Sequence, residues 1–166
     1  GIYSMTGTNS DAWVPINLMT INQSANPFNP NDGLQSAKAI AMGGGSQSYV
    51  TAGILGTDGK VYMCGYNEHG AIGDGSTSHS PYFSRSAVIS THVDEDPTNN
   101  AIVKLRLGRD RYTNVAAVDA SGKLFMWGYN GDYQLGNGTN TNTGTPFNLT
   151  WNDDTGTTVI VSDAYP

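Results

Sequence analysis

The side chains that could perform chemistry are few in this chain, and their spacing matches no recognised catalytic or metal-binding pattern. The three histidines, His69, His79 and His92, lack metal-ligand spacing. No G-x-S-x-G segment is present, and no serine or threonine has a nearby histidine with an orienting carboxylate. The glycine run GGGSQ at 43–47 is followed by no GxxxxGK[ST] pattern, so it is interpreted as a turn rather than a phosphate-binding loop.

Carboxylates gather at three places, which raises the question of calcium. They are HVDEDP at 92–97, WNDD at 151–154 and NPNDG at 29–33. None supplies the full ligand set of a calcium loop, so solvated turns are the default interpretation. We therefore expect no catalytic residue, no cofactor, no metal site and no enzymatic activity.

Composition narrows the class of partner. Only 13% of residues are charged, the formal net charge is -6 and the pI is near 4.7, so nucleic acid is not an expected partner. No apolar run approaches the length of a membrane span, and no signal peptide is visible. Cys64, the single cysteine, cannot form an intrachain disulfide and is interpreted as a buried packing residue.

The elements that position these residues are repeated. VYMCGYNEHGAIGDGST at 61–77 returns as LFMWGYNGDYQLGNGTN at 124–140, an offset of 63 residues. TDGK at 57–60 and ASGK at 120–123 have the chemistry of two-residue hairpin turns. The shared motif consists of Gly65, Tyr66, Asn67, Gly73, Gly75, Gly128, Tyr129, Asn130, Gly136 and Gly138.

Each unit is expected to contain four short strands, so the chain is predicted to be all-β and built of β-propeller blades. Strands are predicted near 39–42, 49–55, 60–66, 102–107, 114–118 and 123–129, and no segment has a sustained helical period. The predicted divisions are the end of one repeat at 1–21, two fuller repeats at 36–89 and 101–150, the start of another at 157–166, and inter-blade loops at 22–35, 90–100 and 151–156.

DGKVYMCGYNEHGAIGDGST and SGKLFMWGYNGDYQLGNGTN resemble the repeat of the regulator of chromosome condensation family. The resemblance implies a propeller, commonly seven-bladed, of which this chain holds two full units and parts of others. Cys64 departs from the pattern, which has tryptophan at this position, as Trp127 does in the second unit. The rest of the ring is expected on the same polypeptide or on other copies of the chain.

The motif itself is interpreted as structural. The paired glycines of each loop are expected to adopt positive φ, where a residue with a Cβ would cost on the order of 1 kcal/mol. Asn67 and Asn130 are expected to hydrogen-bond the loop backbone, and Ile72 and Leu135 to fill the space between blades.

A partner-binding rim is predicted from the long connections between units, because equivalent loops of successive blades project from one side. Its residues are Asn31, Asp32, His92, Asp94, Glu95, Asp96, Trp151, Asp153 and Asp154. The alternative is that these segments are only solvated connectors. Because the rim is acidic, a partner is expected to be basic, cation-bridged or a neutral glycan.

Three functions remain open. The first is a non-enzymatic interaction or structural module of an extracellular or virion assembly, such as a phage tail fibre or surface adhesin, whose partners are protein subunits, the remainder of its own propeller, or a surface glycan. The resemblance also implies two alternatives: guanine nucleotide exchange or regulatory scaffolding as in the founding member, and secreted enzyme inhibition. Aromatic residues clustered on one rim would favour the last.

Overall fold

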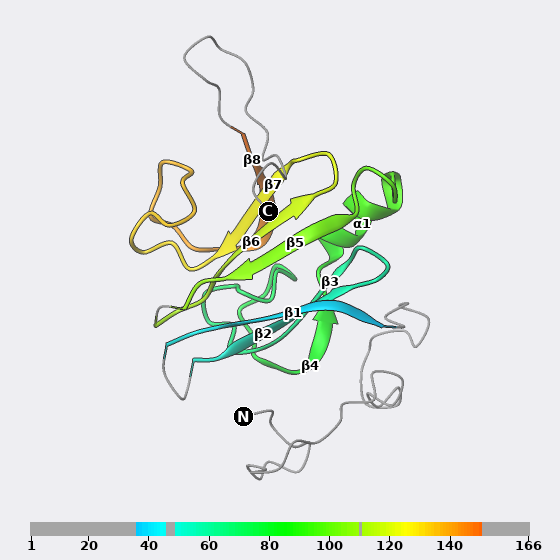
Figure 1. The fold of residues 1–166 in the computed structure, drawn as a ribbon. Coiled ribbons are helices and arrows are strands. Elements are labelled where there is room, and N and C mark those ends of the chain that lie inside the picture. Colours follow the sequence, from blue (N-terminus) through cyan, green and yellow to red (C-terminus); the bar gives the residue numbers. More distant parts are fainter. Residues whose placement is uncertain (1–35, 46–48, 110, 151–166) are drawn as a thin grey trace.

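The computed structural model describes residues 36–45, 49–109 and 111–150. These residues form two four-stranded antiparallel sheets and one helix (Figure 1). The first sheet contains β1 (Ala37–Gly43), β2 (Thr51–Gly56), β3 (Val61–Gly65) and β4 (Ser80–Arg85). The second contains β5 (Ile102–Leu107), β6 (Asn114–Asp119), β7 (Leu124–Gly128) and β8 (Thr143–Leu149). Helix α1 (Ala87–Glu95) connects the two sheets.

Both sheets are simple meanders, with the strands in sequence order and every neighbouring pair antiparallel. The β2–β3 and β6–β7 hairpins turn at Gly59 (φ 76°) and Gly122 (φ 88°), which are the glycines of the predicted turns. Positive φ is readily available only to glycine, so the Asp-Gly and Ser-Gly pairs set the register of each hairpin.

The prediction of an all-β chain built of four-stranded units is confirmed for the described residues. The six predicted strands correspond to β1, β2, β3, β5, β6 and β7, and the bounds of β5 agree with the prediction at both ends.

The presence of helix α1 corrects two predictions. Residues 90–100 were predicted to form a connecting loop, and the chain was predicted to contain no helix. The side chain of Ser86 caps the N-terminus by accepting from the backbone N–H of Ile89. Ile89 and Val93, one helical turn apart, are buried in the hydrophobic core. A helix of nine residues with so few buried positions gives too little periodicity to be detected in the sequence.

The hydrophobic core lies between the sheets and under α1. Leu105 of β5 is buried against the first sheet, where a Cβ added to Gly53 would lie 3.1 Å from its Cδ2. Met63 of β3, Phe125 of β7 and Trp127 belong to the same cluster. Apolar side chains from both sheets thus form one continuous core.

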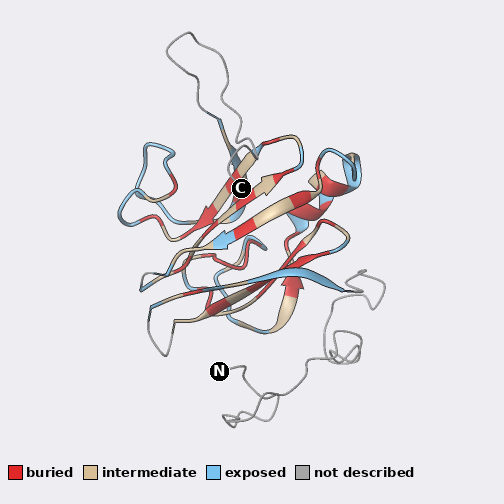
Figure 2. Ribbon diagram, viewed as in Figure 1, coloured by how far each residue is buried: buried red, intermediate tan, exposed pale blue. Residues whose placement is uncertain are grey.

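The outer face of β1 is not covered by any described residue. Figure 2 shows β1 exposed along most of its length, whereas β5 is mostly buried or intermediate. Ile40 and Met42 are 76% and 50% exposed, but Leu105, the repeat equivalent of Met42, is 3% exposed. The difference arises because β5 packs against the first sheet and β1 has no corresponding neighbour among the described residues.

Within the described part of the chain, no helix has the length and apolar character needed to cross a bilayer.

Candidate functional site

The glycine loops that follow β3 and β7 are each held by one buried asparagine. Asn67 donates to the carbonyls of Ser76 and Ser78, both at 3.0 Å, and its Oδ1 accepts from the N–H of Ile72 at 2.7 Å. Asn130 repeats this arrangement with the carbonyls of Thr139 and Thr141 and the N–H of Leu135. Each amide therefore satisfies three backbone groups of a loop that has no strand partner.

The glycines of these loops have the predicted conformation. Gly73 and Gly136 have φ of 78° and 65°, and Gly75 and Gly138 have φ of 81° and 76°. The prediction of positive φ is thus confirmed at all four positions, and the loops would be strained with any residue that carries a Cβ.

Trp127 joins the two sheets at the first glycine loop. Its indole N–H donates to the carbonyl of Ala71 at 2.8 Å, and a Cβ on Gly73 would lie 2.8 Å from the indole nitrogen. Gly70 also packs against the backbone of Gly144, so closely that no side chain fits between them. The junction therefore needs small residues in the loop and a large ring in the adjacent strand.

The residues that form the junction between the two sheets are replaced by different residues at the equivalent positions of the other repeat. Cys64 stands in β3 where Trp127 stands in β7, and Tyr133 stands where Gly70 does. Tyr133 is 62% exposed and is the one non-glycine residue of the described chain with positive φ, at 63°. Burial raises the pKa of the half-buried Cys64 thiol to about 11, partly offset by a backbone hydrogen bond from Ala52.

A cluster of aromatic rings lies at the end of the sheets that carries the glycine loops, which is the left of Figure 1. The rings come from the starts of β2 and β6 and the ends of β3 and β7, which meet because each pair forms a hairpin. The cluster, here called the tyrosine rim, consists of Tyr49, Tyr66, His69, His79, Tyr112 and Tyr129, with Glu68 and Arg111 at its edge.

Ring contacts in the tyrosine rim run within and between the sheets. Tyr49 and Tyr66 lie 4.7 Å apart between ring centroids, and Tyr112 and Tyr129 lie 4.9 Å apart. Tyr49 reaches Tyr112 at 5.4 Å, and His69 lies 4.3 Å from Tyr112. Edge-to-face and offset contacts at these separations are attractive, so the rings also help to hold the two sheets together.

Burial and the carboxylate of Glu68 set the electrostatics of the tyrosine rim. Burial, reinforced by the hydrogen bond and negative charge of Glu68, raises the pKa of Tyr66. Burial lowers the pKa of His69, against a smaller opposing effect of Glu68. His69 is therefore mainly neutral at pH 7 and adds little positive charge to the rim.

The opposite end of the sheets holds the hairpin turns and α1, where the sequence placed the partner-binding rim. Asp94, Glu95 and Asp96 lie together at the C-terminal end of α1, and Asp94 forms an ion pair with Lys60 at 2.6 Å. His92 points inward, with Nε2 2.8 Å from the fully buried Asp119 carboxylate and its ring packed on Phe125. The other predicted residues of this rim, Asn31, Asp32, Trp151, Asp153 and Asp154, lie outside the described residues.

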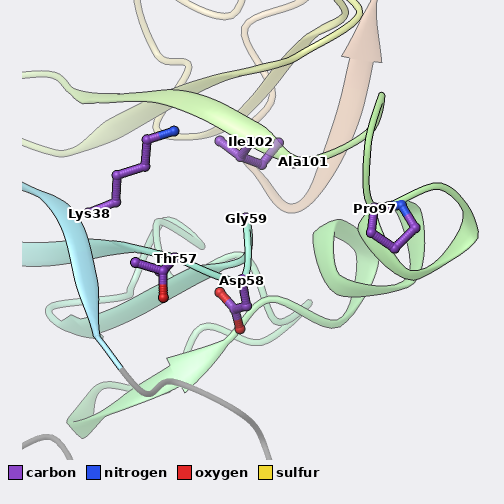
Figure 3. Close-up of a pocket in the computed structure, with 8 residues that line it drawn as sticks. Lys38, Thr57, Asp58, Gly59, Pro97, Ala101 and Ile102 are labelled. Atoms are coloured by element: carbon purple, nitrogen blue, oxygen red, sulfur yellow. The ribbon is translucent and has the colours of Figure 1, made fainter.

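A hollow of about 260 Å³ opens at the same end (Figure 3). Its side chains come from β1, the β2–β3 turn and the segment that leads into β5, and include Lys38, Thr57, Asp58, Pro97, Ala101 and Ile102. Asp58 already accepts from the N–H of Lys60 and the hydroxyl of Tyr62. The walls therefore bring one lysine and one engaged carboxylate together, with no histidine or cysteine among them.

The tyrosine rim was not predicted from the sequence, although the repeat contains a signal for it. Tyr49 and Tyr112, like Tyr66 and Tyr129, are separated by the repeat offset of 63 residues. Tyrosines repeated at the same two places in each unit come together on one rim when the units pack side by side.

No group of three or more metal-ligating side chains converges anywhere in residues 36–45, 49–109 and 111–150.

Two adjacent four-stranded meanders, joined through one buried tryptophan, are consecutive blades of a β-propeller. Residues 121–162 match the family model of the regulator of chromosome condensation (RCC1) repeat, which confirms the resemblance noted in the sequence. Residues 121–162 thus match one RCC1 repeat, and the described residues form part of a propeller.

Two of the solved structures that match this chain illustrate the fold. Human WBSCR16 aligns with a TM-score of 0.53 and 23% identity, over 69% of this chain and 25% of that one. Yeast RCC1 (Prp20), solved with Kap60 bound to it, aligns with a TM-score of 0.53 and 17% identity, over 78% of this chain and 31% of that one. The chain therefore spans about a quarter to a third of these propeller proteins.

Proposed function

We propose that the chain is a non-enzymatic protein-interaction and structural module, and that its two blades form part of a larger propeller or assembly. The observation that carries this proposal is the face of β1 that no described residue covers. Ile40 and Met42 are exposed on β1, whereas Leu105, the β5 equivalent of Met42, is buried against the first sheet.

Leaving this face in water is unfavourable. Burying apolar surface contributes about 25 cal/mol per Å², and edge strands with exposed apolar faces are prone to associate. A further sheet, from the same polypeptide or from another copy of the chain, would cover the exposed face of β1 in the way that the first sheet covers β5. The chain is thereby a component that binds protein surfaces on at least one side.

An extracellular or virion setting, such as a tail fibre or adhesin, is the finer form of this proposal. It is supported by the small fraction of charged residues and by the loops rich in Asn, Thr and Gly. The flanking sequence of the full polypeptide would test it directly, by the presence of a fibre or attachment domain.

Capture of a separate partner protein, as in an inhibitor or regulatory scaffold, is the second candidate. The clustering of tyrosines on one rim favours it, because tyrosine is enriched among residues that dominate binding energy. The yeast structural neighbour is bound to a protein, Kap60, which makes partner binding by such a fold a reasonable model.

Sedimentation across a range of concentrations tests the proposed module. The chain should self-associate or bind a hydrophobic dye through β1, and the double variant Ile40→Lys, Met42→Lys should do neither while keeping its β circular-dichroism signal. Val88→Lys is the matched control, because Val88 is an exposed apolar residue on α1, away from β1. A chain that is monomeric at every concentration and binds no dye would overturn the proposal.

A further inference from the structure

The tyrosine rim is a continuous surface made by both blades rather than a local feature of one loop. Tyr49 and Tyr66 belong to the first blade, Tyr112 and Tyr129 to the second, and the rings contact one another across the junction. Tyr66 is buried, whereas Tyr112 and Tyr129 are only partly buried. Part of each of these two tyrosines is therefore accessible to a partner.

A cation already lies on this surface. The guanidinium of Arg111 is 5.7 Å from the centroid of Tyr49 and 5.2 Å from that of Tyr112, one ring from each blade. The ring face carries negative electrostatic potential, so a cation within about 6 Å is attracted to it. The two-blade geometry thus creates positions where a guanidinium sits against tyrosine rings.

Glu68 adds a fixed carboxylate at the same place. Its side chain is exposed, and it is oriented by a hydrogen bond from the hydroxyl of Tyr66. It lies close enough to His69 to affect its titration, and His69 in turn contacts both Tyr112 and Tyr129. A carboxylate beside aromatic rings is a combination suited to an ammonium or guanidinium group.

We infer that the tyrosine rim, with Glu68, binds arginine or lysine side chains of a basic protein partner. The net charge of -6 attracts such a partner from a distance, and the rings and Glu68 hold its cations at contact. This inference rests on the proposed function as a protein-interaction module. It places the contact at the end of the sheets opposite to the acidic residues of α1, where the sequence predicted a partner-binding rim.

The probe for this inference is the peptide acetyl-(Gly-Arg)4-amide, and binding is followed by backbone amide chemical shifts. The control peptide replaces every arginine with citrulline, which has nearly the same shape but no charge. The arginine peptide should shift the amides around Tyr112, Tyr129 and Glu68, and the citrulline peptide should not. Tyr129→Leu should weaken binding about two- to fivefold, the range of an exposed cation–π contact, and Tyr129→Phe should retain it.

Glu68→Gln and Glu95→Gln form a matched pair, because the same charge is removed from opposite ends of the sheets. Of these two variants, only Glu68→Gln should weaken binding of the arginine peptide. This comparison tests the inference independently of Tyr129→Leu and of whether that variant folds as the unmodified chain does. Equal weakening by both, shifts confined to Asp94–Asp96, or equal binding of the two peptides would overturn the inference. Binding of a neutral oligosaccharide at the rim in place of the arginine peptide would overturn it as well.

The variant Ile40→Lys, Met42→Lys separates this inference from the proposed function. It replaces Ile40 and Met42, neither of which is among the rings or charged groups of the tyrosine rim, and should bind the arginine peptide as the unmodified chain does. If the unmodified chain self-associates through β1 but no variant or chain binds the peptide, the inference alone is lost. If the peptide binds but β1 mediates no association, the inference stands and the proposed assembly is lost.

Discussion

Trp127 of the second blade donates its indole N–H to the carbonyl of Ala71 in the glycine loop of the first blade, at 2.8 Å. Both residues are buried, so the hydrogen bond lies within the junction and away from water. This hydrogen bond joins the glycine loop of the first blade to strand β7 of the second.

Replacing Trp127 with phenylalanine should destabilise the chain by about 1–3 kcal/mol, because the carbonyl of Ala71 would remain buried without its donor. Trp127→Ala should cost about 3–5 kcal/mol, since the ring is also lost from the core. Urea unfolding followed by circular dichroism measures both. A phenylalanine variant as stable as the unmodified chain would show that the hydrogen bond does not support the junction.

Gly73 and Gly138 separate backbone strain from steric conflict. Their φ angles are nearly the same, 78° and 76°, but a Cβ on Gly73 would meet Trp127 at 2.8 Å, whereas a Cβ on Gly138 would meet nothing within 4 Å. Gly138→Ala should cost about 1 kcal/mol from strain alone, and Gly73→Ala should cost clearly more. Equal costs in urea unfolding would mean that the close approach to Trp127 has no energetic consequence.

How far the sequence predicts this structure depends on how local each feature is. The hairpins, the glycine loops and the role of Asn67 depend on neighbouring residues and on a repeat offset, so they could be predicted. The bond from Trp127 to Ala71 joins residues far apart in the chain, and no local pattern contains it. The tyrosine rim also required the relative placement of two blades.

Helix α1 was not predicted, for a different reason. Its buried face consists mainly of Ile89 and Val93, and the acidic residues that follow are typical of a solvated turn. The same acidic residues led to a predicted binding rim that included His92. In the structure the His92 ring contacts Asp119 and Phe125, a role that depends on the next blade being present.

The pairing of His92 with Asp119 predicts a dependence of stability on pH. Burial of Asp119 opposes its ionisation, but hydrogen bonds from His92, Ser121 and the N–H of Lys123 outweigh burial, so its pKa lies below the usual value. A depressed pKa contributes stability that is present above the unfolded pKa, about 3.9, and is lost as pH falls through the folded pKa.

Asp119→Asn should therefore destabilise the chain most at pH 6–7, by about 1–3 kcal/mol, and progressively less as the pH is lowered to 3. Thermal unfolding of both proteins across this range measures the difference. A stability difference that is independent of pH would contradict the assigned role of the Asp119 charge.

Cys64 should react slowly with alkylating reagents. Burial raises its pKa to about 11 from an ordinary value of 9.0, so the thiolate fraction at pH 8 is about 100-fold below that of an unperturbed thiol. Mass spectrometry should show slow modification by iodoacetamide in the folded chain and rapid modification in urea. A folded-state rate like that of a free thiol would show that the Cys64 site is open.

Oxidation of methionine tests most directly whether β1 is covered by another sheet in the native assembly. In the isolated chain, peroxide should convert the half-exposed Met42 to its sulfoxide quickly, and the fully buried Met63 should serve as the slow internal reference. In the assembly isolated from its source, Met42 should be protected to nearly the level of Met63. Oxidation of Met42 at the same rate in the assembly and in the isolated chain would contradict the account.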